Sequence, residues 1–297
     1  MTEHGGINTL PSADNLKRWG KRVSDRCGFC GNIQTLAHIL SNCTVALDQG
    51  RFTWRHDSVL KSIVTFVNCK IRDGFVLFSD LPGHQSPNGG SIPPHILVTP
   101  LRPDIFLVNE LTRDIVVFEL TCPWEKNIVN SHTYKEEKYA PLVADLSRNY
   151  NVSHFSVEIA ARGLISKPNK ARLKSFAFKC CNIGNAEVKR LIMLCSKASL
   201  LSSFSIFQAR NEPSWASPAP LVVRAEAFQT RSIQFLFFYL SYSLVGFMLN
   251  LFITYHLATI CTRPTNCFYW LWNLVTFESC YARSTLSVSL PIVFSFE

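Results

Sequence analysis

The first residues of the chain lack the apolar run of a secretory signal. Without such a signal we expect no oxidising compartment, so the 11 cysteines are expected to be reduced thiols. The matches to the glycosylation pattern at Asn42 and Asn151 are then expected to be chance. Clustered thiols in a reducing compartment point to metal binding. No internal repeat is visible along the chain.

Charge is absent from residues 232–262, a run of 31 residues rich in Phe, Leu, Ile and Tyr. This run exceeds the roughly 20 apolar residues that a membrane-spanning helix needs. A transmembrane helix is therefore an alternative for this part of the apolar tail, 223–297. The segment lacks the basic flanks that fix the orientation of such helices. We favour a tail read through from unrelated sequence, without a selected role.

The basic excess lies entirely within residues 1–231, because residues 232–297 hold two basic and two acidic side chains. The net charge of +9 comes from 30 Lys and Arg against 21 Asp and Glu in 297 residues, a length that allows one or two domains. Between Arg162 and Arg190 there are eight Lys and Arg and one acid, Glu187. Such a surface attracts phosphate backbones, and it is equally consistent with a solvated face that keeps the protein soluble.

The apolar spacing predicts a mixed α/β fold. The apolar runs 104–108 and 115–121 barely alternate, so we expect a hairpin whose strands are buried on both faces. A helical section after Pro123 is expected to break or kink at Pro141. In chain order the other expected elements are a short basic helix in 13–26, a helix over 56–70, strands over 75–78 and 155–159, and helices over 169–181 and 185–210.

A cluster of soft metal ligands follows the basic start of the chain. Cys27, Cys30, His38 and Cys43 lie within 17 residues. Thiolates and an imidazole suit the tetrahedral shell of zinc, and three thiolates indicate a closed, structural site. So small a loop needs the metal to fold. The alternative is that the first two cysteines are incidental and the histidine is an ordinary loop residue.

Two carboxylates interrupt the apolar hairpin. Asp104 opens the first strand, and Glu119 lies between Phe118 and Leu120 near the end of the second. Burying an unpaired carboxylate is costly, so such a residue usually has a cation beside it. Because the start of one hairpin strand lies beside the end of the other, the two acids can converge on one hard divalent ion. Alternatively, Glu119 pairs with a nearby Arg or faces water on an edge strand.

The residues around these acids carry a resemblance. The separated motifs, in order, are Trp54-Arg55-His56-Asp57, Arg102-Pro103-Asp104, Glu119-x-Thr121-x-Pro123-Trp124-Glu125, His132-x2-Lys135-x2-Lys138-Tyr139, Ala160-Ala161-Arg162-Gly163, Arg172-Leu173-Lys174 and Glu212-Pro213-Ser214-Trp215. With the upstream cysteine–histidine cluster, they resemble the C-terminal region of site-specific non-LTR retrotransposons over about residues 13–220. That region contains a restriction-like endonuclease of the PD-D/E-x-K nuclease superfamily.

The resemblance implies a domain order. A basic helical lead-in, 1–26, and a zinc knuckle, 27–50, would precede a restriction-endonuclease-like αβββαβ core, 51–165. Basic C-terminal helices, 166–222, and the apolar tail would follow. The sequence has no adjacent Asp-Asp pair, so the reverse transcriptase motif is missing. We therefore expect the chain to correspond to the C-terminal piece of a longer element.

The resemblance also implies a catalytic site. Asp104 and Glu119, with the Leu120 carbonyl, would hold Mg²⁺ against the scissile phosphate. The superfamily's usual lysine position holds Thr121; in this branch the lysine moves to the next helix, where Lys135 fits and Lys138 is the weaker candidate. The candidate nucleic-acid contacts are Arg55, His56, Lys138, Arg162, Arg172 and Lys174.

The leading expectation is a nuclear endonuclease with structural zinc and catalytic magnesium that nicks chromosomal DNA. Element RNA is a second candidate partner. The alternatives are a nucleic-acid-binding remnant whose nuclease is inactive, and a membrane-anchored protein of unknown role.

Overall fold

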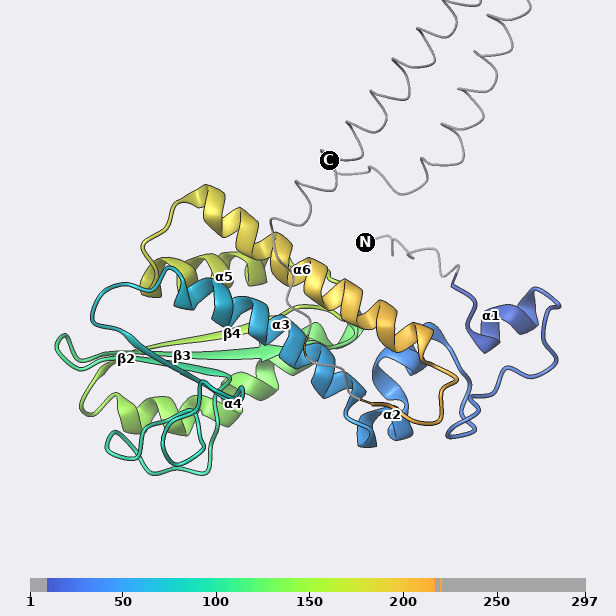
Figure 1. Cartoon of the computed structure of the whole chain (residues 1–297), viewed down its shortest axis with the longest axis horizontal. Coiled ribbons are helices and arrows are strands. Elements are labelled where there is room, and N and C mark those ends of the chain that lie inside the picture. The colour runs from blue at the N-terminus through green and yellow to red at the C-terminus, as the bar shows by residue number, and fades with distance from the viewer. Residues whose placement is uncertain (1–9, 217–219, 221–297) are drawn as a thin grey trace, which may run out of the picture. The chain divides into compact units, whose positions relative to one another are not determined.

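The computed structural model describes residues 10–216 and 220 (Figure 1). These residues belong to one compact unit, Met1–Ala225. The candidate membrane segment 232–262 and the rest of the second unit, Glu226–Glu297, lie outside the described residues. The fold and the candidate sites below are those of the first unit.

A four-stranded mixed sheet in the order β1-β2-β3-β4 forms the centre of the unit. β1 (Val76–Ser79) pairs antiparallel with β2 (Ile105–Asn109), which pairs antiparallel with β3 (Asp114–Thr121). β4 (Asn151–Glu158) runs parallel to β3. A parallel pair needs a long crossover connection, and here a helix provides it.

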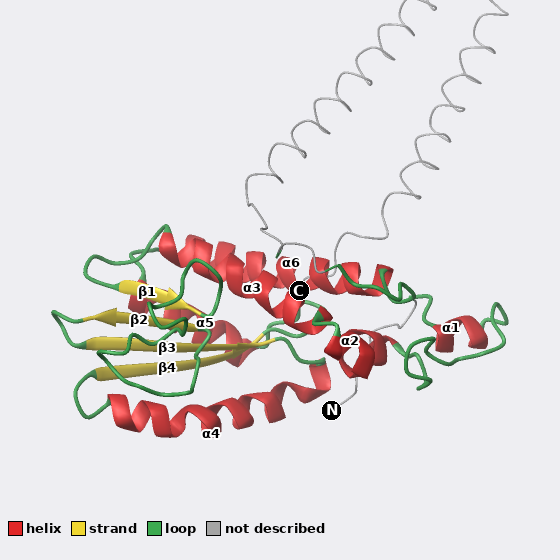
Figure 2. Cartoon of the chain, turned by 60° about the horizontal axis from the view of Figure 1, so that its bottom comes forward, coloured by secondary structure: helices red, strands yellow, loops and turns green. Residues whose placement is uncertain are grey.

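Helices cover both faces of this sheet (Figures 1 and 2). α3 (Arg51–Asn68), α5 (Lys167–Cys180) and α6 (Asn185–Gln208) pack on one face, and α4 (Ile128–Leu146) packs on the other. Because successive side chains of a strand point to opposite faces, β3 needs apolar residues in an unbroken run to fill two cores. All six of its inner residues, 115–120, are buried, including one acid.

The predicted α/β fold is confirmed, and its first six core elements occur in the expected order of helix, three strands, helix and strand. The hairpin buried on both faces is also confirmed: every residue of β2 is buried. A break at Pro141 does not occur, because α4 continues through this residue to Leu146, and the alternative of a kink there stays a prediction. Pro141 is exposed, so the backbone carbonyl left without its helical donor can bond to water.

The N-terminal segment is built from short elements. α1 (Ala13–Arg18) is shorter than the basic stretch that contains it, because Gly20 adopts a left-handed φ of 67° and turns the chain. A π-helical turn, η1 (His38–Asn42), leads into α2 (Thr44–Asp48). Only two residues separate α2 from α3, which starts at Arg51 and so earlier than predicted. The cysteine–histidine segment is thus joined closely to the first core helix.

α6 is the one helix in the described part of the chain that is long and apolar enough to cross a membrane by length and composition. Half of its most apolar window is buried inside the fold. Its inner face, including Leu191 and Ala198, belongs to the same core as α3 and α5. A core helix of this length passes the same test, so α6 is weak support for a membrane protein.

Candidate metal centre and carboxylate site

The cysteine–histidine cluster begins at a tight turn. The amide of Cys27 donates to the Asn32 carbonyl at 2.7 Å, and the amide of Gly31 donates to the Cys27 carbonyl at 3.0 Å. Gly31 has a φ of 74°, a conformation that glycine adopts without strain. The turn places the side chains of Cys27 and Cys30 on the same side as those of the following π-helical turn.

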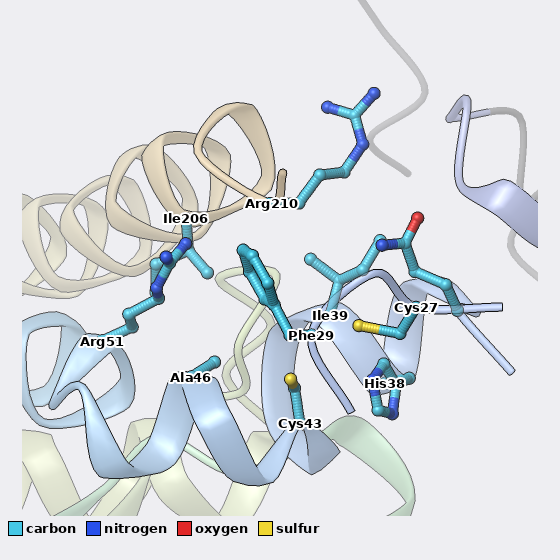
Figure 3. Close-up of a pocket in the computed structure, with 10 residues that line it drawn as sticks. Cys27, Phe29, His38, Ile39, Cys43, Ala46, Arg51, Ile206 and Arg210 are labelled. Carbon is cyan, nitrogen blue, oxygen red and sulfur yellow. The ribbon is translucent and has the colours of Figure 1, made fainter. Parts of the chain in front are cut away.

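The predicted ligands come together. The ligand atoms of Cys27, Cys30, His38 and Cys43 all lie within 4.8 Å of one another. Cys30 Sγ is 3.3 Å from His38 Nε2 and 4.0 Å from Cys43 Sγ. A tetrahedral zinc ion with bonds of about 2.0–2.3 Å would separate its ligands by about 3.5–3.8 Å. The cluster could therefore hold zinc. Figure 3 shows its Cys27, His38 and Cys43 side chains.

Burial sets the protonation states of two of the candidate ligands. Burial and the neighbouring thiols raise the pKa of Cys43 to about 11. Burial lowers the pKa of His38, which keeps its imidazole neutral and able to coordinate. A bound zinc ion would invert the first effect, because a coordinating thiol loses its proton.

The cysteine–histidine cluster is joined to α3 through Arg51. This guanidinium lies 5.3 Å from the centre of the Phe29 ring, beside the cluster (Figure 3). It also lies 5.0 Å from the centre of the Trp215 ring. It also donates to the carbonyls of Ala209 and Glu212 at 2.6 and 2.8 Å. Arg51 therefore ties the segment after α6 to the cluster.

The two hairpin acids also come together. Ile105 pairs with Phe118 across β2 and β3, which places Asp104 opposite Glu119. The amide of Asp104 donates to Glu119 Oε1 at 3.2 Å. The amide of Leu120 donates to Asp104 Oδ2 at 2.6 Å, so Leu120 contacts this acid through its N–H and not through its carbonyl. The Leu120 carbonyl remains a predicted metal ligand.

Lys135 reaches this pair of acids from α4. Its Nζ lies 2.6 Å from Glu119 Oε2, and its side chain is 16% exposed. Tyr139, one turn further along, is buried and donates its hydroxyl to the Arg102 carbonyl at 3.0 Å. Lys138 is exposed and lies over the Tyr139 ring, with Nζ 4.9 Å from its centre. Of the two lysines, Lys135 is the one that contacts the acids.

The buried acids perturb each other. Burial and the charge of Asp104 raise the pKa of Glu119 to about 7, against the opposing charge of Lys135. Burial alone would raise the pKa of Asp104, but the charge and hydrogen bond of His56 hold it below its ordinary value. Two neighbouring carboxyl groups whose pKa values are shifted in opposite directions occur in functional sites and also in structural ion pairs.

His56 takes a position that the sequence did not indicate. Its Nε2 is 3.4 Å from Asp104 Oδ2 and its Nδ1 is 3.0 Å from Asp57 Oδ1. The two acids raise the pKa of His56 well above its ordinary value, although burial opposes this. Asp80 is a further nearby acid, because its amide donates to the Asp104 carbonyl at 3.2 Å. Sequence reasoning missed Asp57 and Asp80 as members of the site.

Arg55 requires a correction. It was expected to contact a nucleic-acid backbone, but it is 2% exposed. Its guanidinium donates to the Leu40 carbonyl at 2.8 Å, the Cys122 carbonyl at 2.9 Å and the Ser203 hydroxyl at 3.3 Å. These bonds join the cysteine–histidine segment, residues 27–43, to the end of β3 and to α6. The guanidinium of Arg55 is buried and its hydrogen bonds are made within the fold, so it is not available to a phosphate.

The other basic candidates differ in exposure. Arg162 is exposed, stacks on Trp124 at 4.8 Å and pairs with Glu125 at 2.8 Å. Arg172 is half-buried and donates to Asn169 at 2.9 Å. Lys174 is exposed beside the Phe178 ring. Together with Lys138, these side chains remain candidate phosphate contacts.

Comparison with protein-family models and with curated proteins finds no match to this chain.

Proposed function

We propose that this chain is a metal-dependent DNA endonuclease of the retrotransposon type that its motifs resemble. The observation that carries the proposal is the convergence of Asp104, Glu119 and Lys135 from three different elements. Asp104 and Lys135 lie 15 and 16 residues from Glu119 in the sequence. In the fold, the Asp104 amide and the Lys135 ammonium both donate hydrogen bonds to the Glu119 carboxylate. A buried pair of acids beside one lysine suits phosphodiester hydrolysis, which needs charge stabilisation at the phosphate.

The donor set fits magnesium, in that Mg²⁺ is commonly held by one or two carboxylates together with water and phosphate oxygens. Asp104 and Glu119 would hold the ion, with the Leu120 carbonyl as a third donor. The ion would supply Lewis acidity and lower the pKa of a bound water. In its absence, burial and the neighbouring charge of Asp104 together raise the pKa of Glu119.

Lys135 would act on the water or on the charge that develops at the phosphate. Its partial exposure leaves the ammonium accessible from the side of α4. When a cation takes over Glu119, Lys135 would be released to turn toward the phosphate. His56 would hold Asp104 in place through Nε2, and its charge would also attract a phosphate oxygen.

The zinc cluster would have a structural role, since three thiolates and one imidazole fill the tetrahedral shell. The basic side chains on α5 and on the loop after β4 would provide salt-dependent, sequence-neutral affinity for DNA. Element RNA would be a second partner. A chromosomal target implies action in the nucleus.

The test is nicking of supercoiled plasmid by the full chain in the presence of Mg²⁺. Asp104→Asn and Glu119→Gln should each abolish nicking while DNA binding is retained. Glu110→Gln is the matched control, because this acid lies in the turn of the same hairpin and is exposed. A wild-type chain that binds DNA but does not nick it would instead support the nucleic-acid-binding remnant.

A further inference from the structure

The sheet face that packs against α4 changes from apolar to polar along its length. At one end Ile115 and Val117 of β3 belong to the apolar cluster with Leu142 and Leu146 of α4. At the other end β3 presents Glu119 and Thr121, which are the register partners of Ser156 and Glu158 in β4. The proposed catalytic acid Glu119 is thus one member of a larger polar layer between the sheet and α4.

Glu158 is as fully buried as Glu119 and has no role in the site described so far. Its side chain is 0% exposed, and its Oε1 accepts hydrogen bonds from the Ser156 hydroxyl at 2.9 Å and His132 Nδ1 at 3.2 Å. Its Oε2 has no hydrogen-bond partner among the described residues, and Arg172 Nη1 is 3.8 Å away. A buried carboxylate held this loosely on one side is costly for the fold alone.

His132 connects Glu158 to the lysine of the site. Residues three, four and seven apart lie on one face of a helix, so α4 directs His132, Lys135 and Tyr139 toward the sheet together. Each contacts a different element: His132 bonds Glu158 in β4, Lys135 bonds Glu119 in β3, and Tyr139 bonds the Arg102 carbonyl before β2. These three contacts fix the rotation of α4 about its axis and its distance from the strands.

We propose that Glu158 and His132 are positioning residues that hold α4 so that Lys135 reaches the carboxylate site. The inference rests on the proposed function for its catalytic consequence. The lysine side chain is long and flexible, so its ammonium is placed only as accurately as the helix that carries it. Displacement of a catalytic group by about 1 Å can cost on the order of a hundredfold in rate.

A second histidine–glutamate pair provides a matched control. His154 of β4 lies 3.5 Å from Glu136 of α4, so it joins the same two elements with the residue types exchanged. Glu136 is exposed and next to Lys135 in sequence, and its recognised ionic contact is with His154 and not with Glu119. If any contact between α4 and β4 were sufficient, the two pairs would be equivalent.

The experiment compares His132→Ala, His132→Asn and His132→Gln with His154→Ala in plasmid nicking. His132→Ala should lower kcat about ten- to a hundredfold with KM for DNA nearly unchanged. His132→Asn should recover most of the loss, because its amide nitrogen takes the place of Nδ1, and His132→Gln should not. Equal losses of kcat in His132→Ala and His154→Ala, or rescue by Gln instead of Asn, would overturn the proposal.

A readout without catalysis separates this inference from the proposed function. In urea unfolding, His132→Ala and Lys135→Met should combine non-additively, by about fivefold in the unfolding constant, while His154→Ala and Lys135→Met should be additive. If His132→Ala does not fold, Glu158→Gln takes its place in the cycle with Lys135→Met and should show the same non-additivity. If the His132 and Lys135 variants are coupled but the wild-type chain does not nick DNA, the positioning role stands and the nuclease is rejected. Additivity in both cycles would reject the positioning role.

Discussion

Glu119 places a carboxylate inside a strand that is covered on both faces, and its side chain is 0% exposed. Among the residues that the structure describes, its cationic partner is Lys135, at 2.6 Å. Glu119 Oε1 also accepts the Asp104 amide, so both oxygens are engaged. The residue is therefore held in one orientation, and its charge state depends on the pH.

Metal-free protein should lose stability as Glu119 ionises. Its folded pKa of about 7 exceeds the ordinary 4.5, so the folded chain binds this proton more tightly than the unfolded chain. The resulting stabilisation is complete below pH 4.5 and is lost as the pH rises through 7, a change of up to about 3 kcal/mol. Urea unfolding in chelator should show this as a steeper pH dependence in wild type than in Glu119→Gln. Parallel curves would contradict the assignment.

The two lysines of α4 should separate in activity. Lys135→Ala should reduce nicking about a hundred- to a thousandfold, since it removes one charge contact at the reacting group. Lys138→Ala should do much less, because Lys138 is exposed and lies against Tyr139. The comparison is made on Mg²⁺-dependent nicking at matched DNA occupancy. An essential Lys138 with a dispensable Lys135 would move the catalytic lysine to the other position.

Individual residues show which parts of the candidate site can be predicted from the sequence and which cannot. Asp104 and Glu119 were placed together from the hairpin register alone, because a short turn fixes which residues are opposite. Glu158 was missed, since it alternates with apolar residues and so resembles an outward-facing strand residue. α4 covers that outer face, and no local pattern reveals which face of a strand a distant helix will cover. Arg55 was misassigned for the same reason, because its acceptors come from distant segments.

At the scale of elements, α3 joins the two candidate sites. Its first turn carries Arg51, which contacts the ring beside the zinc cluster, and the next residues include Arg55 and His56. Arg55 bonds the Leu40 carbonyl, which lies between two proposed zinc ligands, and His56 contacts Asp104. The zinc segment is consequently part of the same structure that positions the acids.

Removing one thiolate should therefore affect more than the local loop. Cys43→Ser should lower bound zinc well below one ion per chain and reduce the stability of the unit, because zinc binding contributes to folding. Cys69→Ser is the matched control, since this free cysteine is exposed. Zinc is measured by mass spectrometry under native conditions and stability by thermal unfolding. A Cys43→Ser chain with full zinc and unchanged melting would remove the cluster from the account.

For the whole unit, the location of the basic residues determines how DNA would approach. α5 starts shortly after the end of β4, near the candidate site, and it presents Lys167, Lys170 and Lys174 to solvent. Near its C-terminal end, Lys179 pairs with Asp114 at the start of β3, which is the opposite end of the sheet. The exposed lysines at the start of α5 thus lie toward the end of the sheet that carries the acids.

Binding to duplex DNA should follow this distribution of charge. Each phosphate contact contributes about 0.9 to the slope of log K against log salt, so replacing Lys167, Lys170 and Lys174 by Gln should reduce the slope by up to about 2.7. Lys179→Gln should change it little, because Asp114 already neutralises this lysine. The slopes are measured by fluorescence anisotropy with a labelled duplex in chelator, which excludes cleavage. An equal change for Lys179→Gln would mean that the whole basic surface attracts DNA without orientation. An unchanged slope in the triple variant would place the phosphate contacts on another face of the unit.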